Sequence, residues 1–171
     1  MTREPVQVVD VTKSGRVSDA AELFFEYMAA TYAELGLPVP AAPSELYEKW
    51  RSELEDPASA YPSPGGLLVA YRRDQPVGVV GMQVKDSTTA EVKHLYVQPE
   101  ERGGVGTILM HALHKRALES GIQRLRLNVL HGRKRALDLY RRLGYVETEP
   151  YTVEPVPVTF LAFDLVASDE R

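Results

Sequence analysis

The segment from Glu91 to Tyr145 constrains the fold of this chain more than any other part of the sequence. It begins with a predicted strand, passes through the glycine-rich turn Arg102-Gly-Gly-Val-Gly106 and continues directly into a predicted helix. A strand that runs through glycines into a helix N-terminus presents several backbone N–H groups to one point, which is how many proteins bind phosphate. The sequence therefore predicts an α/β fold with an anion-binding turn.

The length and composition indicate one globular domain. The chain has 171 residues, of which 44% are apolar and 26% are charged, as in ordinary water-soluble domains. It contains no cysteine, which excludes disulfides and thiolate metal sites and is typical of the reducing cytoplasm. No apolar run approaches the ~20 residues of a membrane span, and the first residues do not resemble a signal peptide. We therefore expect a single domain over residues 1–171, cytoplasmic and without a membrane partner.

Basic residues are concentrated in one part of the chain. Between Arg102 and Arg142 there are ten Lys/Arg and two acidic residues, whereas the remainder has ten Lys/Arg and 22 acidic residues. A basic segment in an acidic protein suggests an anionic ligand on one side of the fold. The alternative is that these side chains belong to solvated helix faces.

Periodicity and turn signals predict one mixed α/β sheet with helices on both faces. The first predicted helix starts at Asp19-Ala-Ala-Glu22, which resembles a helix N-terminus with an acid at the third position, and Gly36 ends it. The other predicted helices are Ser44–Glu55, Val105–Ser120 and Lys134–Leu143. The predicted strands are Val6–Val11, Leu67–Tyr71, Val77–Val84, Ala90–Val97, Arg124–Leu130, Tyr145–Thr148 and Val158–Val166.

The turn between Pro99 and Gly106 carries the clearest binding signal. Its glycines let the backbone approach a ligand and adopt positive φ angles, and successive N–H groups there form a nest for an anion. Two other nucleotide motifs are excluded, because a dinucleotide fingerprint needs a glycine at Leu109 and a Walker motif needs Gly-Lys-Ser/Thr. Taken alone, the turn is a weak signal, since many helix N-termini carry glycine for structural reasons.

A second motif supports the interpretation of the turn as a binding site. The helix that follows the next strand contains Ala136-Leu-Asp-Leu-Tyr-Arg-Arg-Leu-Gly-Tyr145, which matches the pattern Ala-x-x-Leu-Tyr-x-x-x-Gly-Phe/Tyr. Together with Leu95-Tyr-Val-Gln-Pro99 before the turn, it resembles the acetyl-CoA-binding core of the GNAT superfamily of N-acetyltransferases. The resemblance covers residues 67–165 and implies a GNAT-like acyl-CoA N-acyltransferase fold with a mostly antiparallel sheet. Residues 1–60 match only in being one strand and two helices.

The resemblance also implies a set of acetyl-CoA contacts. The pyrophosphate would lie on the glycine turn, and the backbone of the preceding strand would hold the acetyl carbonyl and the pantetheine arm. The cofactor-binding residues expected on this basis are Leu95, Tyr96, Val97, Arg102, Gly103, Gly104, Val105, Gly106, Thr107 and Arg133.

The sequence departs from the family pattern at two places. The turn is one residue shorter than in many members, so that either Arg102 or Glu101 takes the position of the family's arginine. Arg133 stands where an asparagine that contacts CoA is common. Arg133, Lys134 or Arg135 would then either meet a CoA phosphate or face water.

Two residues are the candidates for acid–base chemistry. Tyr140 lies on the apolar face of its helix, so it is either a core residue or, as the resemblance implies, the acid that protonates the leaving thiolate. Glu91 stands where several family members place a carboxylate base, and the alternative is an exposed strand carboxylate. His94 is a second candidate base, although strand alternation predicts that it points away from Glu91. The remaining histidines lack the spacing of a metal site, so no metal is expected.

We therefore predict an acetyl-CoA-dependent N-acetyltransferase in which the primary amine of a small molecule attacks the thioester directly. One alternative is an acetyltransferase for a peptide or protein amine, and another is a non-catalytic acyl-CoA sensor, which the shortened turn motivates. A nucleic-acid-binding module is disfavoured by the acidic remainder of the chain, so no nucleic acid partner is expected. Homodimers are common in the family, and the sequence is compatible with a homodimer or a monomer.

Overall fold

A seven-stranded sheet organises the molecule. The computed structural model describes residues 3–12 and 14–165, and its strands follow the order β1-β2-β3-β4-β5-β7-β6. Neighbouring strands are antiparallel except for β4 and β5, which are parallel. The predicted mixed and mostly antiparallel sheet is thus confirmed. The strands are β1 (Gln7–Asp10), β2 (Gly66–Arg72), β3 (Gln75–Val84), β4 (Thr89–Val97), β5 (Arg124–Leu130), β6 (Val146–Glu147) and β7 (Val158–Asp164).

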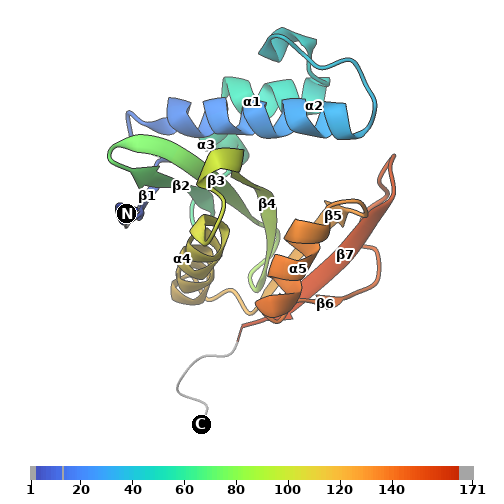
Figure 1. Ribbon diagram of the computed structural model, residues 1–171. Helices are drawn as coiled ribbons and strands as arrows, with labels where there is room; N and C mark the ends of the chain where they lie inside the picture. Colours follow the sequence, from blue (N-terminus) through green and yellow to red (C-terminus); the bar gives the residue numbers. More distant parts are fainter. Residues whose placement is uncertain (1–2, 13, 166–171) are drawn as a thin grey trace.

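Helices cover both faces of the sheet, as predicted (Figure 1). On one face α1 packs against β2 and β3 through a core that includes Phe24 and Val79. On the other face α4 and α5 share a second core, in which Leu109 and Tyr140 meet Leu125 of β5. The helices are α1 (Val17–Glu34), α2 (Glu48–Glu55), α3 (Pro57–Ala60), α4 (Val105–Glu119) and α5 (Lys134–Arg142), with 3-10 turns η1 (Pro43–Glu45) and η2 (Pro99–Glu101).

The N-terminal helices differ from the prediction in two respects. The prediction of one continuous helix over Ser44–Glu55 is wrong: Leu46 is extended, with φ −77° and ψ 159°, and the amide of Tyr47 donates to the hydroxyl of Tyr32 at 2.9 Å. The predicted helix start at Asp19 is also wrong, because α1 begins at Val17 and the Asp19 carboxylate instead accepts a hydrogen bond from the Tyr71 hydroxyl at 2.6 Å. Tertiary hydrogen bonds from tyrosines decide the local structure at both places.

The C-terminal elements lie close to their predicted bounds. Helix α4 begins at Val105 as expected and ends one residue early, and β5 covers the expected residues 124–130. Strand β7 ends at Asp164, and Val166, the last residue of the predicted strand, lies outside the described residues.

A bulge in β4 overturns the prediction that Glu91 and His94 face opposite sides of the sheet. His94 has a φ of 53°, and the register between β3 and β4 shifts in this region. The His94 ring packs beside Tyr27 of α1, with 5.2 Å between ring centroids. Burial and the negative charges of Glu53 and Glu91 raise the pKa of Tyr61, which belongs to the core beneath α1. Glu91 therefore also lies near the α1 side of the sheet. The extra residue of the bulge therefore brings Glu91 and His94 to one face.

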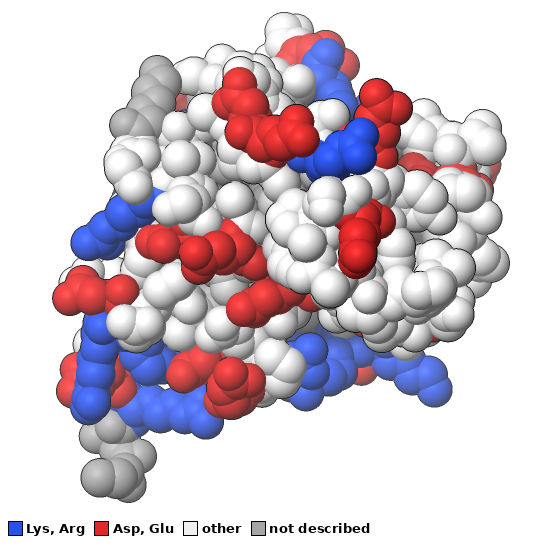
Figure 2. All heavy atoms as spheres, turned by 90° about the horizontal axis from the view of Figure 1, so that it is seen from above, with Lys and Arg blue, Asp and Glu red and all other residues white. Residues whose placement is uncertain are grey.

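Charged side chains are unevenly distributed over the surface. Figure 2 shows the side of the sheet that α1 and α2 cover, where acidic side chains lie over the middle of the face and several Lys and Arg gather at its margin. Within the described ranges no helix is both long and apolar enough to cross a membrane. That part of the chain also contains no group of three or more acidic or histidine side chains arranged to hold a metal ion.

Candidate active site

Strands β4 and β5 diverge, and a cleft lies between them. In the described residues the two strands pair over Thr89–Glu91 and Arg124–Arg126, at one end of β4, and then separate (Figure 1). The cleft has a volume of about 1130 Å³ and is walled by the end of β4, the glycine turn, α4, α5, residues 130–133 and α1. It contains all the turn and strand residues that the sequence predicted to bind acetyl-CoA except Val105, which is buried in the core.

The N–H groups of Leu95 and Val97 point toward this cleft. The amide of Gln98 donates to the carbonyl of Val77 on β3 at 3.0 Å, so the even-numbered amides at this end of β4 face β3. Because successive N–H groups of a strand alternate between its two neighbours, those of Leu95 and Val97 face the side from which β5 has diverged. Two donors are therefore directed at any carbonyl or amide that enters the cleft along β4.

The glycine turn forms the N-terminus of α4. Gly103 and Gly104 have φ angles of 123° and 111°, which L side chains rarely adopt, and Gly104 is the N-cap residue without a side-chain cap. The amide of Ile108 is the one that donates to the Gly104 carbonyl, at 3.1 Å, so the amides of Val105–Thr107 have no intrahelical acceptor. The first turn also lacks acidic residues, so the positive end of the helix dipole faces an anion site without competition.

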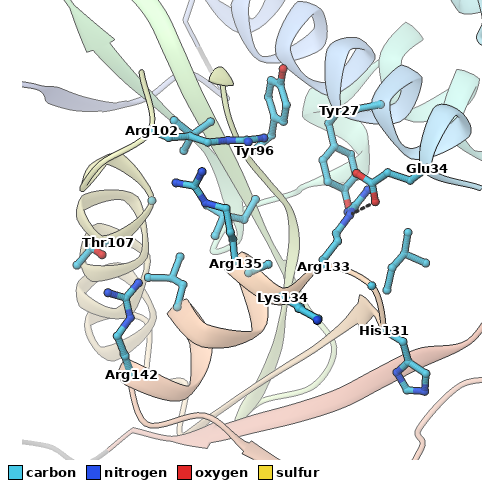
Figure 3. A pocket seen from close by; sticks show the side chains of 18 of the residues that line it. Tyr27, Glu34, Tyr96, Arg102, Thr107, His131, Arg133, Lys134, Arg135 and Arg142 are labelled. Atoms are coloured by element: carbon cyan, nitrogen blue, oxygen red, sulfur yellow. Dashed lines mark hydrogen bonds and ion pairs between the residues drawn. The ribbon is translucent and has the colours of Figure 1, made fainter. Parts of the chain in front are cut away.

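Arg102, and not Glu101, is the charged turn residue that lines the cleft. The Glu101 carboxylate accepts a hydrogen bond from Nε of Arg72 at 2.8 Å. In the close view, the side chains of Arg102 and Thr107 lie on the same side of the cleft as the start of α4 (Figure 3). Of the two residues that the shortened turn left open, Arg102 is therefore the one that lines the cleft.

Three further cationic side chains line the cleft from α5. They belong to Lys134, Arg135 and Arg142, and Figure 3 shows them around the space below Arg102. Together with the N-terminus of α4 they make this part of the cleft strongly positive. A ligand with several phosphate groups is the kind of anion that such a surface attracts.

Arg133 also lines the cleft, but its guanidinium binds α1 (Figure 3). It donates to the Tyr27 hydroxyl at 2.7 Å, to Oγ1 of Thr31 at 2.6 Å and to the carboxylate of Glu34 at 2.9 Å. The guanidinium carbon also lies 4.7 Å from the centroid of the Tyr27 ring. Arg133 thus connects the segment after β5 to α1 across the cleft, and its donors face α1 rather than a phosphate.

Tyr140 is buried beside the cleft, with 6% of its surface exposed. Burial raises the pKa of its phenol well above the usual value, the neighbouring Tyr27 adds to this, and the charge of Arg133 opposes it. Every fully buried side-chain nitrogen or oxygen in the described part of the chain has a hydrogen-bond partner. The Tyr140 hydroxyl forms no such bond with another described residue. A protonated phenol is therefore held next to Tyr27 and Arg133, which line the cleft.

Glu91 lies outside the cleft and is ion-paired. Its carboxylate is 4% exposed and contacts Nη2 of Arg126 at 2.9 Å, Nζ of Lys93 at 3.2 Å and Nζ of Lys85 at 3.6 Å. Burial alone would raise the pKa of Glu91, but the charges of Lys93 and Lys85 and the hydrogen bonds from Lys93 and Arg126 lower it below the usual value. Such a carboxylate is a weak proton acceptor.

A pair that the sequence did not predict joins β4 to α2. Nε2 of His94 donates to Oε2 of Glu53 at 2.8 Å, and the Tyr61 hydroxyl donates to the same oxygen at 3.1 Å. Both side chains of the pair are 10% exposed. Nδ1 of His94 forms no hydrogen bond with another described residue. The sequence contained one sign of this pair. Glu53 lies three residues after Trp50, so an acidic side chain falls near the apolar face of the helix.

The comparisons with known proteins agree with this geometry. The family model described as "Acetyltransferase (GNAT) family" matches residues 24–145. An uncharacterized N-acetyltransferase of Schizosaccharomyces pombe is 30% identical over 109 residues, which are 61% of this chain and 67% of that protein. The thialysine N-epsilon-acetyltransferase of Bos taurus is 44% identical over 54 residues, 31% of this chain, so the match spans about a third (32%) of that relative.

Solved structures share the fold. The PaiA N-acetyltransferase of Thermoplasma acidophilum, solved in complex with coenzyme A, superposes with a TM-score of 0.69 over 94% of this chain and 99% of its own. The sequence identity is 16%, so this likeness concerns the fold alone.

Proposed function

This chain belongs to the GNAT family of acetyltransferases, and from that premise we propose that its acetyl-CoA-dependent reaction acetylates the primary amine of a small molecule. The bovine relative is named for acetylation of the ε-amine of thialysine, which supports an acceptor of this kind. The proposal treats the chain as a single domain that works in the cytoplasm and binds neither nucleic acid nor a membrane. Its chemical steps use only side chains and backbone amides of the protein.

In this proposal acetyl-CoA lies along the cleft. The N–H groups of Val105–Thr107 at the start of α4 and the guanidinium of Arg102 bind the pyrophosphate. The pantetheine arm runs beside β4, where its amides pair with the backbone that β5 leaves free. The N–H groups of Leu95 and Val97 then face the thioester end and stabilise the oxyanion that forms there.

The reaction is a direct transfer. The amine nitrogen attacks the acetyl carbonyl carbon, and the tetrahedral intermediate collapses with cleavage of the carbon–sulfur bond. The nitrogen loses a proton to a base, and the CoA thiolate takes a proton from the Tyr140 phenol. The raised pKa keeps the phenol protonated over the working pH range, so its proton is available when the thiolate forms beside it.

We assign the base to His94 rather than to Glu91. The lowered pKa and the three cationic partners of Glu91 oppose proton transfer to it. His94 has one ring nitrogen oriented by Glu53 and the other without a described partner, which is the arrangement of a histidine that accepts a proton. Its ring packs against Tyr27, and Tyr27 lines the cleft, so His94 lies next to the α1 wall of the cleft.

The observation that carries the proposal is the divergence of β4 and β5 near the protonated phenol of Tyr140. The test is release of free CoA thiol from acetyl-CoA in the presence of a panel of primary amines, with mass spectrometry of the acetylated products. Wild-type protein is expected to acetylate at least one amine, and Tyr140→Phe is expected to lower kcat by about 10²-fold or more with little change in thermal stability.

The same experiment separates an enzyme from an acyl-CoA sensor. A sensor would bind acetyl-CoA, which a thermal shift detects, but would release no thiol with any amine. If a peptide library were acetylated and the small amines were not, the acceptor would be a peptide or protein amine. Sedimentation of the apoprotein would decide between the monomer and the homodimer.

A further inference from the structure

Three cations converge on one buried carboxylate beside the candidate active site. Arg126, Lys93 and Lys85 lie within 2.9, 3.2 and 3.6 Å of the Glu91 carboxylate. Arg126 contacts one oxygen of Glu91, Oε1, through Nε at 3.1 Å and Nη2 at 2.9 Å, and the two lysines contact the other oxygen. Glu53, whose charge also acts on Lys93, and Glu154, near Tyr151, are the other acids in reach of the cluster, and each of them is bound by further groups.

Two of the cations are partly exposed, and the arginine is fixed in position. The side chains of Lys93 and Arg126 are 22% and 27% exposed. The guanidinium carbon of Arg126 lies 4.2 Å from the centroid of the Tyr151 ring, which holds the plane of the fork. The other acid near Tyr151 is Glu154, which is engaged with Asn128 and Thr152. An oriented arginine with a lysine beside it forms a preorganised site for a carboxylate.

The cluster lies on the side of the sheet where the proposed base, His94, would meet the acceptor amine. It lies on the same face of the sheet as His94, because of the bulge in β4. The pair Glu91–Arg126 is three residues from His94 along the strand, or ~10 Å at the usual rise. On this face α1 covers β2 and β3, whereas Tyr151 packs on Phe160 of β7 with 5.0 Å between centroids. The cluster thus lies between the N-terminal helices and the segment before β7.

We propose that the acceptor amine carries a carboxylate and that Arg126 and Lys93 bind it while the amine reaches His94. This rests on the proposed function and specifies its substrate class as amino acids with an amine at the end of the side chain. The two ends of such a molecule are separated by a chain of methylene groups, on the scale of the distance between the cation cluster and His94. The amine end meets the Glu53–His94 pair and the aromatic ring of Tyr27, both of which favour a cationic group.

The test compares amines that differ in the carboxylate. Lysine and cadaverine have the same chain and terminal amine, and ornithine and putrescine form a second such pair. For the wild-type protein kcat/KM is expected to be at least about tenfold higher with the carboxylate in each pair. In Arg126→Gln the ratio of lysine to cadaverine is expected to fall toward one, through a higher KM for lysine.

Arg124→Gln is the matched control. Arg124 lies on the same strand and the same face, and pairs with Asp164 at 2.7 Å instead of with Glu91. Its replacement is expected to leave the lysine to cadaverine ratio unchanged. Lys93→Gln, expected to lower the ratio in part, provides a second variant should Arg126→Gln fold poorly in a thermal melt.

The possible outcomes distinguish the two proposals. Equal or higher kcat/KM for cadaverine and putrescine in the wild-type protein would overturn the carboxylate site but leave the acetyltransferase intact. The carboxylate site is likewise overturned if Arg126→Gln and Arg124→Gln lower the ratio equally. If no amine of either pair, and none of the wider panel, releases thiol, the proposed function fails and the carboxylate site fails with it.

Discussion

His94 combines a strained backbone with an oriented side chain. A φ of 53° is uncommon for histidine and costs on the order of 1 kcal/mol or more, so the surrounding structure must enforce it. The enforcing contacts are Phe24 and Tyr27 on α1, whose ring centroids lie 5.1 and 5.2 Å away, and the hydrogen bond to Glu53. Strain of this kind is retained where it positions a functional group.

This assignment predicts a pH-dependent defect in His94→Gln. Glutamine can still donate to Glu53 but cannot accept a proton, so kcat at pH 7 is expected to fall by about 10²-fold. The defect is expected to shrink near the pKa of the acceptor amine, because an amine that is already neutral needs no base. The titratable groups around His94 are Glu53, which it binds, and Tyr27. Tyr61 and Lys93, the latter on β4 itself, act on Glu53. A defect of equal size at every pH would show that His94 has only a structural role.

His114 makes a separate prediction about stability. Burial lowers the pKa of His114 to about 4, the neighbouring His111 adds to this, and the ring stacks on Phe163 at 4.9 Å. The unfolded chain therefore binds a proton near pH 6.5 that the folded chain refuses until about pH 4. The free energy of unfolding that neutral His114 contributes is fully present above pH 6.5. It is lost as the pH falls from 6.5 to about 4, by about 2 kcal/mol after allowance for partial exposure.

Urea unfolding of His114→Gln between pH 7 and pH 4.5 tests this. The variant keeps a polar partner for the Tyr145 hydroxyl, which lies 2.8 Å from the histidine Nε2. Its free energy of unfolding is expected to change less with pH than that of the wild-type protein. His131→Gln, which removes an exposed histidine, is expected to keep the wild-type slope. Identical slopes in His114→Gln and the wild-type protein would contradict the prediction.

At the scale of elements, Arg133 makes the segment between β5 and α5 a structural connection to α1. Its planar fork uses three donors at once, and lysine cannot reproduce that geometry. Arg133→Lys is therefore expected to lower the free energy of unfolding by about 2 kcal/mol and to raise the KM for acetyl-CoA, since α1 forms one wall of the cleft. Arg141→Lys is the control, because Arg141 forms only an exposed pair with Glu147 at 3.3 Å and is expected to cost less than about 0.5 kcal/mol. Equal losses in the two variants would refute this role.

The elements also differ in how well the sequence predicts them. Helix α4 and strand β5 match their predicted bounds to within a residue because glycines and apolar periodicity, which are local signals, define them. The start of helix α2 and the bulge at His94 were missed because the causes are tertiary: a hydrogen bond from the amide of Tyr47 to the hydroxyl of Tyr32, and aromatic packing under α1. For the same reason residues of the motifs line the cleft, whereas the partners of His94 and Arg133 lie on α1 and α2, where no motif was present.

At the scale of the whole molecule, the separation of charge has a kinetic consequence. The net charge is −4, yet Arg102, Lys134, Arg135 and Arg142 line the cleft. A polyanionic ligand is therefore attracted to one site on a protein that repels it elsewhere, and salt screens that attraction. The KM for acetyl-CoA is expected to rise about threefold or more between about 50 and 500 mM salt. Acetyl-pantetheine, which lacks the phosphates, is the control, and a similar rise for both compounds would argue against electrostatic attraction.

The short ladder between β4 and β5 implies that the sheet is completed by its ligand. Only three residue pairs join these strands in the described chain, and beyond them the N–H groups of Leu95 and Val97 have no strand to bind. The pantetheine amides of acetyl-CoA would take the place of that missing strand. Although they lie inside a seven-stranded sheet, these two amides should exchange hydrogen with solvent quickly in the free protein and slowly once the thioester arm is in place.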